Sequence, residues 1–186
     1  MLWKQQTFFM PFLNVEIKAR TSNPSAIRNY LLNNEADFKG TDQQTDTYFN
    51  VNNGRLKLRE GNIETNLIFY ERSTEPGPKT SQFNLVKVAD PEGLKKALEC
   101  SLGIKVIVRK EREIYYIKNV KFHIDSVPGL GSFVEIEAGN LLAELLQPEL
   151  KLQCAFYLKE LGIKNEDLIA ESYSDMLLNI ETINVK

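Results

Sequence analysis

Short segments of this chain alternate ionic and apolar side chains with the two-residue period of a β-strand. Residues 55–60 read RLKLRE, with a cation at every second position, and residues 133–138 read FVEIEA, with two carboxylates on one face. Such a strand has one ionic and one apolar face, because successive side chains point to opposite sides. If the apolar faces pack on helices, the ionic faces meet either water or one another, and in a closed barrel they would line its interior.

The expected elements are about eight strands, mostly joined by tight turns, with helices inserted at three places. The strands are expected at residues 14–20, 46–51, 55–60, 66–72, 80–88, 105–112, 113–117, 121–125 and 133–138. The helices are expected at residues 24–34, at residues 91–103, and in the C-terminal part at residues 140–161 and 166–178. Pro148 should break or kink the helix that contains it, since proline lacks an amide hydrogen. The sum predicts an α+β fold with a large antiparallel sheet that closes on itself.

Composition excludes several classes of protein. The formal net charge of −2 gives no sign of a nucleic-acid partner, and no apolar run approaches the roughly 18 residues of a membrane span. Two distant cysteines, Cys100 and Cys154, and a single histidine, His123, exclude a zinc site of the usual composition. The first residues lack the features of an export signal, so a cytoplasmic location is expected. One domain is expected over residues 12–180, with an extension at 1–11 and a tail at 181–186.

An interior that holds both cations and carboxylates suits a polyanion that carries a metal ion. Lysine and arginine neutralise phosphate oxygens, arginine through two parallel hydrogen bonds. Carboxylates bind Mg²⁺ or Mn²⁺, which in turn bridge to phosphates. The pattern therefore favours a tunnel for a phosphorylated ligand and a divalent metal, whereas ionic faces that are merely solvated are the alternative.

The same residues form a series of short motifs that cover almost the whole chain. The motifs are Asn14-Val15-Glu16-Ile17-Lys18, Gln44-Thr45-Asp46-Thr47-Tyr48-Phe49, Gly54-Arg55-Leu56-Lys57-Leu58-Arg59, Val108-Arg109-Lys110-Glu111-Arg112, Lys121-Phe122-His123-Ile124-Asp125, Phe133-Val134-Glu135-Ile136-Glu137 and Glu171-Ser172-Tyr173. In this order and spacing the chain resembles the CYTH superfamily, the triphosphate tunnel metalloenzymes. This group includes class IV adenylyl cyclases, thiamine triphosphatases and inorganic triphosphatases.

The resemblance implies an eight-stranded antiparallel closed β-barrel with flanking helices, which holds a metal-bound triphosphate in its tunnel. It implies Mg²⁺ or Mn²⁺ as cofactor, with the ligands Glu16, Glu135 and Glu137. The implied phosphate-binding residues are Lys18, Lys57, Arg59, Lys79, Lys110, Arg112 and Lys121. The implied catalytic residues are Arg72, which would clamp phosphate, Asp125, which would bind or orient the metal, and Tyr48.

Two positions depart from the family pattern. Asn14 replaces the first carboxylate of the N-terminal motif, so this position brings no charge to a metal ion. Arg72 stands where other members carry a lysine, and arginine does not lose its proton in a protein, which disfavours it as a base that activates water. His123 is either a proton-transfer residue or a polar histidine bonded to Asp125.

By the branch that it resembles, the chain is expected to be a class IV adenylyl cyclase-like enzyme that converts ATP to cyclic AMP and pyrophosphate. The alternative is a triphosphatase that hydrolyses inorganic, nucleoside or thiamine triphosphate. A second alternative, favoured by Asn14, is a catalytically weak polyphosphate- or nucleotide-binding module. The expected partner is a triphosphate-bearing small molecule, with no nucleic acid and no membrane, and the chain is expected to be a monomer or a homodimer.

Overall fold

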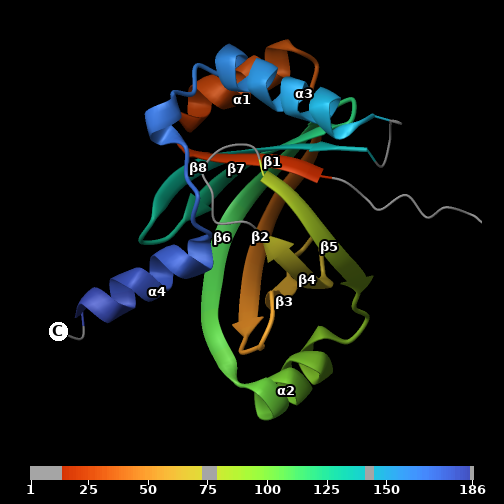
Figure 1. The fold of residues 1–186 in the computed structure, drawn as a ribbon, viewed down its shortest axis with the longest axis vertical. Coiled ribbons are helices and arrows are strands. Elements are labelled where there is room, and N and C mark those ends of the chain that lie inside the picture. Colours follow the sequence, from red (N-terminus) through yellow and green to blue (C-terminus); the bar gives the residue numbers. More distant parts are fainter. Residues whose placement is uncertain (1–13, 73–78, 141–144, 185–186) are drawn as a thin grey trace, which may run out of the picture.

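The computed structural model describes residues 14–72, 79–140 and 145–184 (Figure 1). Eight strands form one sheet. They are β1 Asn14–Arg20, β2 Asp37–Phe49, β3 Arg55–Glu60, β4 Asn66–Arg72, β5 Lys79–Lys87, β6 Ile104–Ile117, β7 Val120–Val127 and β8 Gly131–Gly139. The helices are α1 Pro24–Asn33, α2 Pro91–Leu102, α3 Gln147–Glu160 and α4 Tyr173–Asn184, with a 3₁₀-helix at Asn165–Asp167.

Neighbouring strands are antiparallel, in the order β1-β5-β4-β3-β2-β6-β7-β8. The order returns on itself because β1 pairs with both β5 and β8. The two closing contacts differ in length, since β1 pairs with β8 from residue 14 to residue 20 but with β5 only from residue 14 to residue 16. The expected barrel is confirmed. Because β1 and β5 pair over only a short stretch, the barrel is a strongly curled sheet that is held less firmly at this contact.

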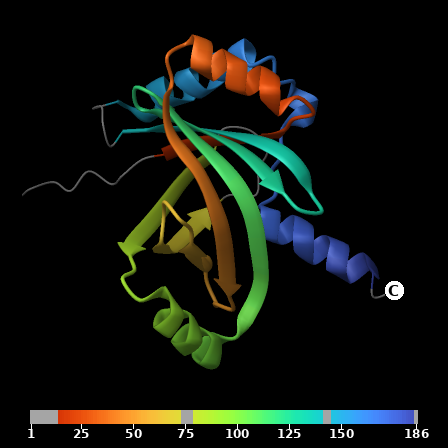
Figure 2. The same ribbon diagram turned by 180° about the vertical axis from the view of Figure 1, so that it is seen from behind.

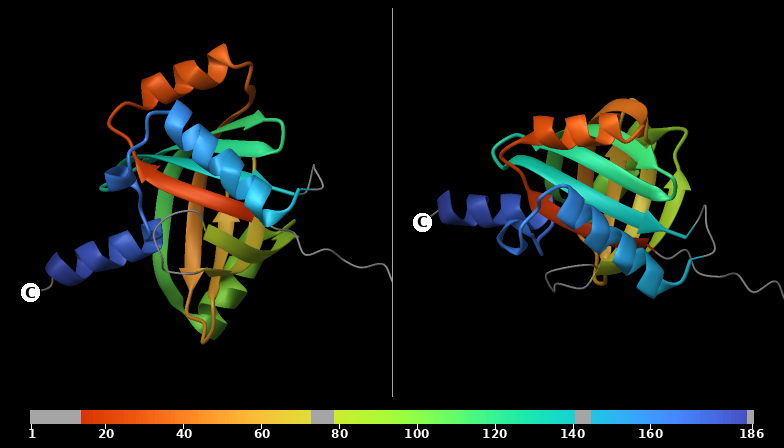
Figure 3. Two further views of the ribbon diagram at one scale, coloured as in Figure 1. Left: turned by 45° about the horizontal axis from the view of Figure 1, so that its top comes forward. Right: turned by 90° about the horizontal axis from the view of Figure 1, so that it is seen from above.

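Two helices cover one side of the barrel. Helices α1 and α3 lie over the outer face of β1, β7 and β8, as Figures 1 and 3 show. The apolar halves of these strands pack against the helices, and Phe122, Ile136, Leu31 and Leu150 are fully buried there. Burying each such side chain contributes about 1.5–3 kcal/mol to folding. The ionic halves of the same strands are therefore directed toward the inside of the barrel.

The other helices lie away from this cover. Helix α2 lies at the opposite end of the molecule, and α4 projects outward near β6 (Figures 1 and 2). Asn23 and Asp90 cap α1 and α2, because each side chain accepts a backbone N–H from three residues further on. None of the described helices is both long enough and apolar enough to cross a membrane.

Strands β2 and β6 differ most from the lengths that the sequence pattern predicts. Strand β2 begins at Asp37, whereas the pattern predicts a start at residue 46. The pattern misses the first half of β2 because this half is polar and lacks the apolar alternation, although it pairs with the second half of β6. Residues 104–117 form one continuous strand and not two. This long β2–β6 pair extends the barrel wall, so the cavity inside is deeper than the short predicted strands would allow.

The C-terminal helices also begin later than expected. The described part of α3 starts at Gln147, so Pro148 lies in its first turn, where a missing amide hydrogen breaks no helical bond. The expected break or kink at Pro148 is confirmed as a break, because Leu146 just before the helix is extended, and residues 141–144 lie outside the described residues. Helix α4 starts at Tyr173 and not at residue 166.

Candidate active site

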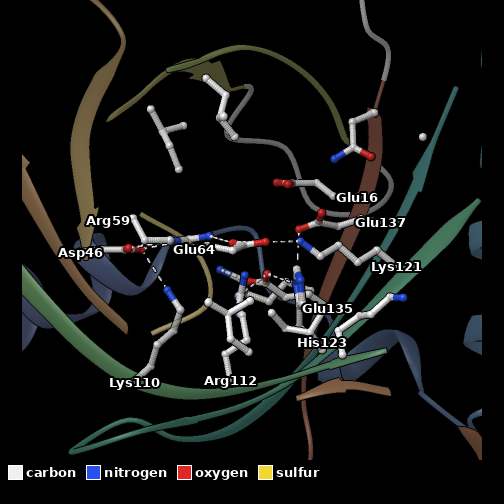
Figure 4. Close-up of a pocket in the computed structure, with 18 of the residues that line it drawn as sticks. Glu16, Asp46, Arg59, Glu64, Lys110, Arg112, Lys121, His123, Glu135 and Glu137 are labelled. Carbon is white, nitrogen blue, oxygen red and sulfur yellow. Dashed lines mark hydrogen bonds and ion pairs between the residues drawn. The ribbon is translucent and has the colours of Figure 1, made fainter. Parts of the chain in front are cut away.

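The inner faces of the strands surround a cavity of about 850 Å³ (Figure 4). This volume lies within the range of small-molecule sites. Of the residues expected from the sequence, its wall contains Glu16, Lys18, Tyr48, Lys57, Arg59, Lys110, Arg112, Lys121, Glu135 and Glu137. The ionic faces of the strands thus meet one another around a shared interior.

A cluster of cations surrounds one carboxylate, Asp46 of β2. Lys57 Nζ lies 2.8 Å and Lys110 Nζ 2.9 Å from Asp46 Oδ2, and Arg59 Nε lies 2.8 Å from Asp46 Oδ1. Asp46 is only 1% exposed. Strand β2 lies between β3 and β6 in the sheet, which brings its carboxylate within reach of cations from both neighbours.

Burial and charge act in opposite directions on this cluster. Burial alone would raise the pKa of Asp46, but the charges of Arg59, Lys110 and Lys57 outweigh it and hold that pKa well below its ordinary value. Burial lowers the pKa of Lys110 to about 7, and the nearby arginines add to the decrease although Asp46 opposes it. Lys110 is therefore an amine in the cavity that can exchange a proton near neutral pH.

A second carboxylate, Glu64, extends this ionic network across the cavity. Its Oε2 lies 3.1 Å from Arg59 Nη1, and its Oε1 lies 2.9 Å from Lys121 Nζ. Asp42 fixes the loop between β3 and β4, because its carboxylate oxygens accept the backbone N–H groups of Ile63 and Glu64. The loop thereby places a carboxylate between two of the expected phosphate-binding residues (Figure 4).

The expected metal ligands lie on β1 and β8. The strand register places Glu16 opposite Glu137, and Lys18 opposite Glu135. Two cations hold Glu135 in place, since its Oε1 lies 3.0 Å from Lys18 Nζ and its Oε2 lies 2.6 Å from Arg112 Nη2. The three carboxylates of the N-terminal and C-terminal motifs are thus brought together although they are far apart in the sequence.

This carboxylate cluster fits a divalent cation. Burial raises the pKa of Glu137 to about 7, and the charges of Glu135 and Glu16 add to the increase while Lys121 opposes it. The part of this shift that comes from Glu135 and Glu16 is a repulsion between carboxylates, which a divalent cation would relieve. Carboxylate oxygens suit Mg²⁺ and Mn²⁺, and Asn14, which also lines the cavity, offers an uncharged amide oxygen.

His123 of β7 joins these carboxylates. Its Nδ1 lies 3.3 Å from Glu135 Oε2 and 3.4 Å from Glu137 Oε1. A bond to Asp125 is not formed, because residues two apart on a strand are farther from each other than cross-strand neighbours, and His123 is paired with Glu135. Burial and nearby cations lower the pKa of His123 to about 3, so its ring is neutral at pH 7.

Asp125 faces the barrel interior, opposite Arg112 in the strand register, but it does not line the cavity. It is fully buried and accepts hydrogen bonds from Arg112 Nε at 2.7 Å and from the Tyr173 hydroxyl at 2.8 Å. Asp125 therefore positions Arg112, and the metal-binding or metal-orienting role expected for it stays a prediction. Tyr173 begins α4, and the centre of its ring lies 3.7 Å from Lys18 Nζ. These contacts anchor the C-terminal helix to the site.

Of the three remaining predicted site residues, Tyr48 lies in the cavity wall, whereas the side chains of Arg72 and Lys79 are not described. Tyr48 lines the cavity with its hydroxyl 3.4 Å from that of Tyr70, and burial raises the pKa of Tyr48 to about 12, which keeps the phenol protonated. The backbone of Arg72 ends β4, and that of Lys79 begins β5 opposite Glu16. The side chains of Arg72 and Lys79 lie outside the described residues, so their roles stay predictions.

Sequence reasoning did not select Asp46, Glu64 or Tyr173 as site residues. Asp46 stands two residues before Tyr48 on the same strand face, so the strand alternation carries a signal for it. Glu64 lies in a loop without periodicity, and Tyr173 lies beyond the last strand. Only the folded chain brings these two residues to the barrel.

The CYTH domain family model matches residues 13–173. A Methanocaldococcus jannaschii protein named "Putative adenylate cyclase MJ0240" is 26% identical over 177 residues, which cover 88% of this chain and 98% of that protein. The PH1012 protein of Pyrococcus horikoshii has a similar structure, with a TM-score of 0.75 and 25% identity over 87% of this chain and 98% of that one. The Hippeastrum protein HpAC1, described with a dominant triphosphatase activity, shares the fold with a TM-score of 0.56 and 15% identity, over 90% of this chain and 94% of its own. The chain therefore belongs to the CYTH domain family.

Proposed function

We propose that this protein is a metal-dependent triphosphatase that cleaves the terminal phosphoanhydride bond of a linear triphosphate in its tunnel. The convergence of Lys57, Arg59 and Lys110 on one buried carboxylate, Asp46, carries this proposal. Cations arranged around a single anionic group provide the hydrogen-bond donors that a phosphoryl group requires. Phosphoryl transfer depends mostly on positioning and charge stabilisation, and this cluster supplies both.

The carboxylate wall complements the cation cluster. Glu16, Glu135 and Glu137 would hold Mg²⁺ or Mn²⁺, and such an ion, when bound, neutralises phosphate charge and makes phosphorus more open to attack. Arg112 lies next to these carboxylates and is oriented by Asp125, so it can clamp a phosphate oxygen beside the ion. The cavity therefore offers donors for phosphate oxygens and ligands for the accompanying cation.

Lys110 is the proposed proton-transfer residue. In the reaction, a water oxygen bonds to the terminal phosphorus, the bond from that phosphorus to the bridging oxygen breaks, and orthophosphate separates from the remaining diphosphate. The departing bridging oxygen needs a proton or a compensating charge. Lys110, whose pKa is about 7, can hold this proton at Nζ and donate it near neutral pH.

A second candidate function is adenylyl cyclisation, in which the ribose 3′-hydroxyl of ATP attacks the α-phosphorus and pyrophosphate leaves. An apolar part of the cavity wall favours it, because Ile63, Ile68 and Leu85 offer a surface for a nucleobase. The name of the Methanocaldococcus jannaschii relative points to the same reaction. The two candidates share the triphosphate-binding cations and differ in their products.

Product analysis distinguishes these candidates. The purified protein is incubated with ATP, tripolyphosphate or thiamine triphosphate, each with Mg²⁺, Mn²⁺ or a chelator, and the products are separated by anion-exchange chromatography. Metal-dependent release of orthophosphate without cyclic AMP supports the triphosphatase. Cyclic AMP with pyrophosphate would replace it with the cyclase, and binding without any product would leave a binding module.

Glu137→Gln tests the assigned metal ligands. The variant should lose metal-dependent turnover because it removes one carboxylate from the cluster, while its circular dichroism spectrum stays unchanged. Glu166→Gln is the matched control, since that side chain is 73% exposed on the 3₁₀-helix and should keep full activity. Wild-type activity in Glu137→Gln would contradict the assignment of the carboxylates.

A further inference from the structure

His123 is the only histidine of the chain, and the proposed cleavage does not use it. Its side chain is 1% exposed and lies in the carboxylate cluster, with Nδ1 3.3 Å from Glu135 Oε2 and 3.4 Å from Glu137 Oε1 (Figure 4). We propose that His123 is a nitrogen ligand of the divalent cation in this cluster and makes the site prefer Mn²⁺ over Mg²⁺. This inference rests on the proposed function, which assigns an ion to these carboxylates.

The distances suit shared coordination better than a hydrogen bond. Hydrogen bonds of the N–H···O type are usually about 2.7–3.2 Å long. Two ligand atoms about 2.1 Å from one ion, at an angle of about 90–110°, lie about 3.0–3.4 Å apart. The Nδ1 atom of His123 has this spacing to both carboxylate oxygens, and one ligand atom from each of the three residues lies within 4.8 Å of the others.

The second ring nitrogen gives an independent indication. His123 Nε2 is buried and has no hydrogen-bond partner among the described residues. Buried polar atoms are nearly always paired, so the unpartnered Nε2 shows that no other group among the described residues fixes this ring for a structural purpose. The neighbouring cations Arg112 and Lys121 donate to carboxylates instead of to this ring. Among the described residues, the ring nitrogens thus contact only the two carboxylates, through Nδ1.

The sheet presents these ligands from a rigid surface. The register pairs His123 of β7 with Glu135 of β8, and Glu137 of β8 with Glu16 of β1. Phe122, the residue before the histidine, points to the opposite face and is fully buried under the helices. Ligands on packed strands keep their positions better than ligands on loops, which allows a site to discriminate between similar ions.

One nitrogen among oxygen ligands changes which ion binds best. Mg²⁺ prefers oxygen ligands and retains several waters. First-row transition-metal ions accept imidazole more readily, and their affinity for a given site rises from Mn²⁺ along the series. Between the two ions implied for this family, a site containing His123 should therefore select Mn²⁺.

Pulsed electron paramagnetic resonance of bound Mn²⁺ tests the proposal without measuring activity. The full chain, free of any histidine tag, is prepared with ¹⁴N-histidine or with ¹⁵N-histidine and loaded with Mn²⁺ in the absence of substrate. Because His123 is the only histidine, an imidazole coupling that changes with the label can come from no other residue. We expect this coupling in the wild type and its loss in His123→Gln, with the Kd for Mn²⁺ raised about tenfold and that for Mg²⁺ changed much less.

His123→Asp provides a matched variant that restores an oxygen ligand. It should bind Mn²⁺ without imidazole coupling and should show a smaller Mn²⁺ preference in competition titrations against Mg²⁺. Mn²⁺ bound to the wild type without a label-dependent coupling would overturn the proposal and leave the triphosphatase intact. Failure of both ions to bind, even with tripolyphosphate present, would overturn the proposed function as well. If neither variant folds, the wild-type coupling alone decides.

Discussion

Asp46→Asn removes one charge from the centre of the barrel while keeping the shape of the side chain. In the wild type this carboxylate accepts hydrogen bonds from Lys57, Arg59 and Lys110, and all four residues are at most 9% exposed. The variant leaves three buried cations around a neutral amide. Removing one partner of a buried ion pair typically destabilises a protein by about 3–5 kcal/mol.

This loss in the free energy of unfolding should lower the melting temperature considerably. For a chain of this size, 1 kcal/mol corresponds to about 2–4 °C, so the melting temperature should fall by about 6–20 °C. The loss should be smaller at alkaline pH, because Lys110 has a pKa of about 7 and a neutral amine no longer repels its neighbours. Lowering the pH charges Lys110 and should increase the destabilisation.

The assay is thermal denaturation followed by circular dichroism, with and without tripolyphosphate and in the absence of divalent metal. A phosphate anion can replace the missing carboxylate, so tripolyphosphate should raise the melting temperature of Asp46→Asn more than that of the wild type. Glu113→Gln is the control, since Glu113 forms its ion pair with Arg28 and does not line the cavity. The reasoning is refuted if Asp46→Asn melts within about 2 °C of the wild type, or if tripolyphosphate stabilises both proteins equally.

Three further predictions follow from the same structure. Only about one Lys110 in ten is protonated at pH 8, given its pKa of about 7, so tripolyphosphate binding should take up nearly one proton. Calorimetry in two buffers should detect this uptake in the wild type and not in Lys110→Arg, and equal uptake in both would contradict the assignment. Tyr173→Phe should lower the free energy of unfolding by about 1.5–3 kcal/mol through the lost hydrogen bond to Asp125, and no change in chemical denaturation would argue against that bond. Phe122→Ala should cost about 3–5 kcal/mol in the same experiment, because Phe122 fills the core beneath the helices, and a loss below 1 kcal/mol would be inconsistent with its burial.

The barrel was predictable because its ionic residues recur with strict strand periodicity. The alternation in residues 55–60 and 133–138 survives in β3 and β8, and Lys57, Arg59, Glu135 and Glu137 line the cavity. The pattern failed for the first half of β2, where polar residues occupy both faces. Pairing with β6 stabilises that half, and such non-local pairing leaves no periodic signal in one strand alone.

The sequence predicts which types of residue form the site, but it predicts less well which of them form ion pairs with one another. The sequence identifies Lys57 and Arg59 as phosphate-binding candidates, but it does not show that Asp46 already occupies the point where they converge. It also does not show that the buried Asp125 holds Arg112 in place. Ion pairs between strands depend on register and depth, which only the assembled sheet determines.

The way in which β1 completes the ring has a consequence for how the chain folds. Its register joins residue 16 to residue 137, so the first and the last strand of the sheet pair with each other. During synthesis, β1 is the first strand to emerge, and its edge toward β8 stays unpaired until most of the domain has left the ribosome. Contacts this distant in sequence are slow to form, so ring closure is expected to be a late step of folding, and the unpaired N-terminal strand is the segment most exposed to aggregation before then.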